Sequence, residues 1–106
     1  MSEPASPVAV IFLSTRTDGH GDEYQQAAAD MEAAARQQPG FLRLHSARDP
    51  ATGAGVTVSL WIDEPSALEF KQVAEHRKVQ QAGRDRFYQD YEVIVAQVTR
   101  TYRFST

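Results

Sequence analysis

The pattern of apolar and polar residues divides the chain into four strands and two helices. Runs rich in β-branched and aromatic residues predict strands over residues 8–16, 41–48 and 56–62, and a long last strand over residues 91–104. Helical spacing of apolar residues begins at residue 22 and stops at the Gln-Pro-Gly motif of residues 38–40. A second helix is predicted over residues 63–84, with a break near residues 75–76.

The first helix presents one apolar face, which should lie close to the sheet because most of its side chains are small. The residues of this face are Tyr24, Ala27, Ala28, Met31, Ala34 and Ala35.

This order of elements predicts an α+β fold of the ferredoxin-like βαββαβ type: a four-stranded antiparallel sheet with both helices on one face. The turn residues at 49–55 indicate a hairpin between the second and third strands. The first and last strands are apolar on both faces, whereas a sheet with one solvated face should alternate. The chain offers nothing else to cover the second face, so we expect a homodimer that closes sheet against sheet.

Composition narrows the class of protein. The 106 residues correspond to one domain over residues 8–106, preceded by a flexible arm of residues 1–7. The absence of cysteine excludes disulfides, thiolate metal sites and cysteine nucleophiles. A net charge of −3 argues against nucleic acid as a partner. Neither a membrane span nor a signal peptide is recognisable, so we expect a cytoplasmic protein.

Several short motifs, taken in order, resemble the antibiotic biosynthesis monooxygenase superfamily of small dimeric α+β barrels. They are Gln38-Pro39-Gly40-Phe41, Val58-Ser59-Leu60-Trp61, Ala67-Leu68, Phe70-Lys71, Glu75-His76, Gly83-Arg84, Phe87-Tyr88 and Val98-Thr99-Arg100-Thr101-Tyr102. Characterised members include cofactor-free oxygenases that act on quinols or anthrones. The resemblance therefore implies a cofactor-independent monooxygenase-like enzyme for an aromatic, quinol-type molecule. The alternative is a non-catalytic dimeric module that binds a small apolar ligand.

Cofactor-free oxygenation requires a dry apolar chamber, a base, and donors that hold the substrate oxygen. His76 is the candidate base, because histidine titrates near neutrality and the resemblance places a histidine here. The alternative for His76 is a structural hydrogen bond at the helix break. Trp61 and Ser59 share one strand face and suggest a cavity wall. The alternative for Trp61, which its residue type favours, is a position in the core or at the dimer interface.

Other candidates are expected to contact the same substrate. They are Ile11, Leu13 and Thr15 on the first strand, Phe70 in the second helix, and the possible phenolate donors Tyr88 and Tyr91. The two tyrosines are alternatively interface residues. His45 is expected to be packed or solvated, and His20, although it stands between glycines near two aspartates, does not predict a metal site.

Haem chemistry is a specific alternative within the resemblance. Haem-degrading members resemble one another in an asparagine late on the first strand, a tryptophan in the second helix and a histidine further along. The corresponding positions here are Thr15, Phe70 and Gln80, and all three differ. Without an imidazole at Gln80, iron lacks an obvious protein ligand. We therefore expect neither haem nor any other cofactor.

Overall fold

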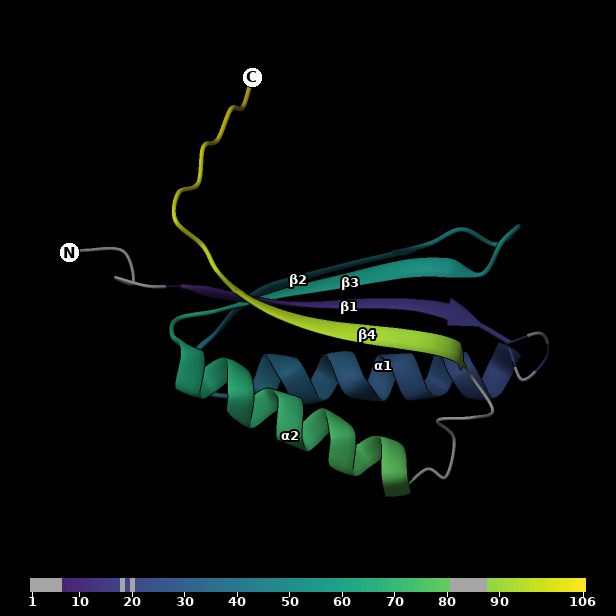
Figure 1. Ribbon diagram of the computed structural model, residues 1–106. Helices are drawn as coiled ribbons and strands as arrows, with labels where there is room; N and C mark the ends of the chain where they lie inside the picture. The colour runs from purple at the N-terminus through teal and green to yellow at the C-terminus, as the bar shows by residue number, and fades with distance from the viewer. Residues whose placement is uncertain (1–6, 18, 20, 81–87) are drawn as a thin grey trace.

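The computed structural model describes residues 7–17, 19, 21–80 and 88–106, without the side chains of residues 74–80 and 88. The elements follow in the order β1 (Val8–Arg16), α1 (Gly21–Gln37), β2 (Phe41–Arg48), β3 (Ala54–Trp61), α2 (Glu64–Gln80) and β4 (Tyr88–Gln97), as labelled in Figure 1. This βαββαβ order confirms the predicted ferredoxin-like α+β fold.

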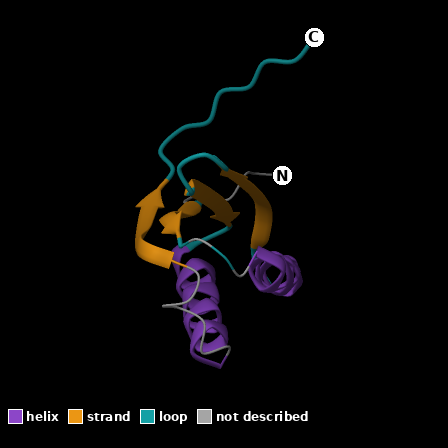
Figure 2. Ribbon diagram, turned by 90° about the vertical axis from the view of Figure 1, so that its right-hand side faces the viewer, coloured by secondary structure: helices purple, strands orange, loops and turns teal. Residues whose placement is uncertain are grey.

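The four strands form one antiparallel sheet in the order β2-β3-β1-β4. Both helices lie on the same face of this sheet, as the end-on view of Figure 2 shows. Among the described residues, no helix or strand covers the other face. The molecule is therefore a two-layer structure with one helix-covered face and one open face.

The helix-covered face contains the core. Val8 and Val10 of β1 are directed toward the helices and pack with Trp61, Phe70 and two helix alanines. The Trp61 side chain is 0% exposed, and its ring stacks on Phe70 with 4.9 Å between ring centroids. The helix alanines are Ala35 in α1 and Ala67 in α2, both fully buried. Because alanine is small, it lets each helix approach the sheet closely, as the sequence pattern predicted.

The loop before β2 packs against the beginning of α2. Gly40 has a φ of +84°, and its carbonyl accepts a hydrogen bond from the Ile62 amide (2.9 Å). Asp63 caps α2 by accepting a hydrogen bond from the Ser66 amide (2.9 Å). Hydrogen bonds from the Ser66 side chain and backbone hold the pKa of Asp63 below its ordinary value.

Three elements differ from the prediction. β3 begins at Ala54 and ends at Trp61, instead of extending over residues 56–62. α2 continues without a break through residues 75–76, where the sequence has no glycine or proline to interrupt it. β4 begins at Tyr88 and ends at Gln97, because Gln97 pairs with Val8, the first residue of β1. Residues 98–106 form no regular element and leave the sheet on the side away from the helices (Figures 1 and 2).

The centre of the open face of the sheet is apolar, as the doubly apolar strands predicted. Its side chains come from three neighbouring strands and are half-buried or exposed. They are Ile11, Leu13, Val56, Val58, Leu60 and Ile94. Leu13 is 38% exposed, which is unusual for a leucine in a central strand. No helix among the described residues is long and apolar enough to span a bilayer.

Candidate functional site

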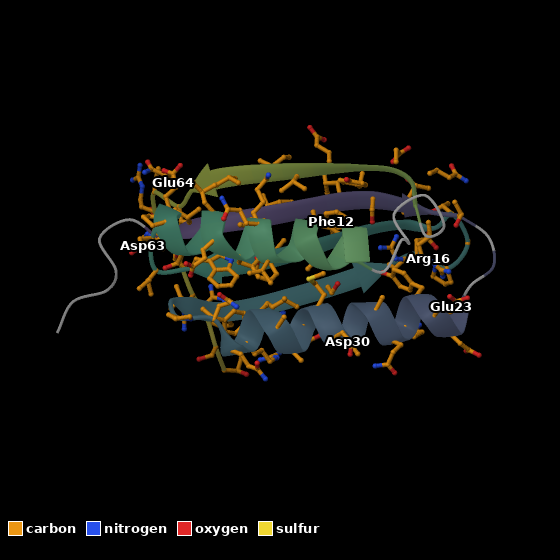
Figure 3. All side chains as sticks on the ribbon, turned by 90° about the horizontal axis from the view of Figure 1, so that it is seen from below. Phe12, Arg16, Glu23, Asp30, Asp63 and Glu64 are labelled. Atoms are coloured by element: carbon orange, nitrogen blue, oxygen red, sulfur yellow. The ribbon has the colours of Figure 1, made fainter. Side chains whose placement is uncertain are left out.

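A cavity of about 640 Å³ lies between the helix-covered face of the sheet and the two helices. Its volume falls within the range usual for sites that bind small molecules. Figure 3 views the molecule from this side, with Phe12 in the middle of β1 and Arg16 at its end. The cavity has apolar walls and a polar, cationic end.

The apolar walls come from both layers. The sheet contributes Val10, Phe12, Leu44 and Val93, and the helices contribute Ala28, Ala29, Met31 and Phe70. The alternation of the strands places the sheet residues on one side, because Val10, Phe12 and Val93 share a face in the β1–β4 register. A flat apolar molecule would be enclosed here, with a flexible methionine able to adapt to its shape.

Hydroxyl groups line the part of the wall formed by β2 and β3. Ser46 Oγ and Thr57 Oγ1, which belong to paired residues, lie 2.6 Å apart in a hydrogen bond. Ser59 is buried and accepts a hydrogen bond from Trp61 Nε1 (2.9 Å). Trp61 does not line the cavity itself. It donates a hydrogen bond to Ser59 and stacks on Phe70, and both of these residues line the cavity.

The cationic end is built around Tyr24 of α1. The Arg16 guanidinium carbon lies 4.3 Å from the centre of the Tyr24 ring, and that of Arg48 lies 5.2 Å from it. Arg48 donates hydrogen bonds to the Gly53 carbonyl (2.6 Å), Ser14 Oγ (2.9 Å) and Tyr24 Oη (3.0 Å). These contacts bring the ends of β1 and β2 and the beginning of α1 together.

Gly55 makes room for Arg48. The two residues are paired across β2 and β3, and a Cβ atom at Gly55 would lie 2.6 Å from Cζ of Arg48. A side chain at this position would therefore displace the guanidinium.

The described residues that line the cavity carry more positive than negative charge. Arg16, Arg48 and Lys71 are cationic, and Glu32 is the carboxylate among them. Glu32 forms an ion pair with Arg36 on the next turn of α1 (2.9 Å). This part of the lining is thus cationic, although the whole chain has a net charge of −3.

Residues 7–82 match the protein-family model described as antibiotic biosynthesis monooxygenase. The chain belongs to this family. It is 36% identical over 96 residues to YqjZ of Bacillus subtilis, a match that covers 91% of this chain and 82% of YqjZ.

Two further comparisons involve proteins named as oxygenases. Jasmonate monooxygenase ABM of Pyricularia oryzae is 32% identical over 98 residues, which is 90% of this chain but 45% of that protein. The crystal structure of SnoaB, a cofactor-independent oxygenase from Streptomyces nogalater, superposes with a TM-score of 0.72. It has 18% sequence identity and covers 92% of this chain and 97% of SnoaB, so it shows a shared fold.

Of the candidate substrate contacts predicted from the sequence, Ser59, Phe70 and Tyr91 line the cavity. Tyr91 belongs to the same sheet face as Ser14, and its ring lies 5.4 Å from that of Phe12.

The expectation that Ile11, Leu13 and Thr15 share this wall is wrong. Trp61 pairs with Val8, and Ser59 pairs with Val10. Residues paired directly across two antiparallel strands share a face, so the even-numbered residues of β1 face the cavity. Ile11, Leu13 and Thr15 belong to the open face instead.

The remaining candidates are the three histidines and Tyr88. His76 lies in α2 and Tyr88 begins β4, but both side chains lie outside the described part of the structure. His20 also lies outside it. His45 is exposed, and its pairing with Val58 places it on the open face. Within residues 7–17, 19, 21–80 and 88–106, no group of three His, Cys, Asp or Glu residues is arranged to hold a metal ion.

The cationic end of the cavity was not predicted from the sequence. Arg16 and Arg48 are the last residues of their strands, where arginine commonly marks a solvated end. One signal for Arg16 was available, because it has the same parity in β1 as the buried Val8 and Val10. Tyr24 was predicted on the buried face of α1, but its role between two arginines depends on contacts distant in sequence.

Proposed function

We propose that this protein is a cofactor-independent, monooxygenase-like oxidoreductase that binds a small aromatic molecule of the quinol or anthrone type in the cavity. The observation that carries the proposal is an apolar cavity with hydroxyl and cationic groups at one end. Membership of the antibiotic biosynthesis monooxygenase family supports it. Two similar proteins named as oxygenases, jasmonate monooxygenase ABM and SnoaB, add support.

In the proposed reaction the substrate is the reductant. Loss of a proton gives an electron-rich anion, which passes one electron to dioxygen, and the two radicals combine as a peroxide. For an anthrone, breaking the O–O bond leaves one oxygen atom on the ring as a carbonyl. The other leaves as water with the two hydrogens of the oxidised carbon, so no further reductant is needed.

The groups lining the cavity suit this chemistry. Positive charge from Arg16, Arg48 and Lys71 favours the anionic form of the substrate, because opposite charge nearby stabilises an ionised group. The apolar walls, Phe70 among them, exclude water from the reactive anion. Tyr91 is proposed to donate a hydrogen bond to the substrate oxygen, as is Tyr88.

His76 remains the proposed base for removal of the substrate proton. Its support comes from the sequence: a histidine at this point of α2 and the ability of imidazole to titrate near neutrality.

We also propose that the active unit is a homodimer in which two open sheet faces meet. The exposed apolar residues of β1, β3 and β4 favour burial against a second copy of the same face.

Oxygen uptake with a panel of hydroquinones and anthrones, in buffer containing a metal chelator, tests the proposed activity. Ala28→Trp should fill the cavity and lower the rate about tenfold or more, because a misplaced substrate loses the reactive geometry. Ala33→Trp is the matched control, since Ala33 is an exposed residue of α1 that does not line the cavity. Binding of these compounds without any oxygen uptake would contradict the proposal and indicate a ligand-binding module instead.

A further inference from the structure

We infer that the cationic end of the cavity binds a carboxylate, so that the preferred substrate is an aromatic molecule bearing an acid group. The inference rests on the proposed use of this cavity as the substrate pocket. It specifies the chemical class of the substrate beyond its aromatic body.

The state of Arg16 is the first observation. Its guanidinium stacks on Tyr24 and donates one hydrogen bond, from Nη2 to the Gly19 carbonyl (2.7 Å). Its Nε is shielded from solvent and has no hydrogen-bond acceptor among the described residues. Because stacking occupies a face of the guanidinium, the remaining N–H groups point along its edge. Arginine binds a carboxylate through the N–H groups on this edge of the guanidinium.

The second observation is that Arg16 has no carboxylate partner in the described part of the chain. Glu32 lines the cavity but is paired with Arg36. Glu23, which belongs to the same end of the molecule in Figure 3, is exposed and does not line the cavity. The described residues thus supply no counter-ion to this half-buried cation, and a bound anion would offset the cost of burying its charge.

Arg48 strengthens this site through the same tyrosine. Because Tyr24 contacts both guanidinium groups, two like charges are held at one end of the cavity. Arg48 is fixed there by hydrogen bonds to Gly53, Ser14 and Tyr24. Arg48 thereby holds Tyr24 in place under the Arg16 guanidinium, so Arg16 is ordered before an anion binds and the entropy cost of binding is lower.

A carboxylate fits these groups better than a phenolate does. Its two oxygens match adjacent N–H groups of one guanidinium, whereas a phenolate presents a single oxygen. A carboxylic acid is also ionised at neutral pH without a base, so the charge is present when the substrate enters. The remaining apolar walls then enclose the ring to be oxidised.

Binding of three naphthalene probes, measured by calorimetry at neutral pH, tests the inference. They are 2-naphthoate, which carries the carboxylate, its methyl ester, which is neutral, and 2-naphthol. We expect 2-naphthoate to bind about tenfold or more tightly than the ester, the size of effect that one charged hydrogen-bonded pair provides. Arg16→Gln should remove this preference by weakening the acid alone. Arg43→Gln is the matched control, because Arg43 pairs with Leu60 on the open face and does not line the cavity. Since that face is the proposed dimer interface, light scattering must first give this variant the same mass as the unaltered protein.

Equal binding of 2-naphthoate and its ester to the unaltered protein would overturn the inference, and that result does not depend on any variant folding correctly. The inference would also be overturned if 2-naphthol bound as tightly as the acid and its affinity rose as the phenol ionised. The site would then bind a phenolate instead of a carboxylate. The assay measures no turnover. If the protein prefers the acid but takes up no oxygen, only the proposed oxygenase activity is contradicted. If it takes up oxygen with neutral phenols but binds the acid no better than the ester, only the carboxylate site is contradicted.

Discussion

The buried hydrogen bond between Trp61 and Ser59 connects the core to the cavity. Ser59→Ala should lower the free energy of unfolding by about 1–3 kcal/mol, because the buried indole N–H loses its acceptor. Urea denaturation followed by tryptophan fluorescence measures this directly. Ser46→Ala is the matched control: its hydrogen bond to Thr57 is exposed, so water can replace the lost partner. Equal losses in the two variants would contradict the assigned role of Ser59.

His76 is the residue on which the proposed chemistry depends most. If it is the base, His76→Ala should lower the rate of oxygen uptake by about 10²–10⁴-fold, the usual contribution of general acid–base catalysis. The melting temperature should change little. Melting and oxygen uptake are measured on one preparation. A variant that loses stability but keeps full activity per folded molecule would assign His76 a structural role.

The residues of the site could be predicted only in part. Ser59 was found because the strand face that it shares with Trp61 suggests a cavity wall, and Tyr91 was found as a possible donor to a phenolate. The wrong placement of Ile11 and its neighbours follows from the register, in which a shift of one residue exchanges the two faces of a strand. When both faces of β1 are apolar, the sequence does not indicate which parity faces the helices.

At the scale of elements, order and type were predictable, whereas the ends of β4 were not. Local pattern specified β1 and β2 completely, since both have clear turn or breaker residues at their ends. β4 ends at the point where β1 has no further residue to pair with. The end of β4 therefore depends on β1, which is distant in the sequence. The predicted break in α2 had no helix-breaking residue to support it, and the helix is continuous there.

The contact between Gly40 and the beginning of α2 gives a prediction at this scale. Gly40→Ala should cost about 1–3 kcal/mol of stability, because alanine is strained at positive φ and its Cβ would lie 2.8 Å from Ser66 Cβ. Thermal unfolding is the measurement.

Two other glycines separate the causes. Gly19 also has positive φ but open space around it, so Gly19→Ala tests the backbone strain alone. Gly21→Ala, which has neither strain nor a close neighbour, should leave the melting temperature unchanged. A Gly40→Ala protein as stable as Gly21→Ala would contradict the assigned packing.

For the whole molecule, the open sheet face predicts a homodimer. Light scattering at micromolar concentration should give about twice the chain mass of 11.8 kDa. Val58→Glu should give the monomer mass, because a charge would be buried in the centre of the interface. Leu68→Glu is the control, since Leu68 is an exposed apolar residue of α2 on the helix side. A monomer mass for the unaltered protein would contradict the proposed assembly.

The C-terminal segment is expected to contribute to the same interface. Tyr102 and Phe104 are 83% and 89% exposed, and the segment leaves the sheet on its open side (Figure 1). Large aromatic side chains in such positions favour burial against a partner surface. These residues were predicted to continue the last strand, whereas β4 ends at Gln97.

Isotopic labelling of the oxidised product tests the central claim most directly. An anthrone is incubated with the chelator-treated protein under labelled dioxygen, and the product is analysed by mass spectrometry against a sample without protein. We expect each product molecule to gain one labelled oxygen atom, faster than without protein, and Ala28→Trp to lower the accelerated rate about tenfold or more. Acceleration only after addition of flavin, haem or a metal ion, or label entering from water instead of dioxygen, would contradict it.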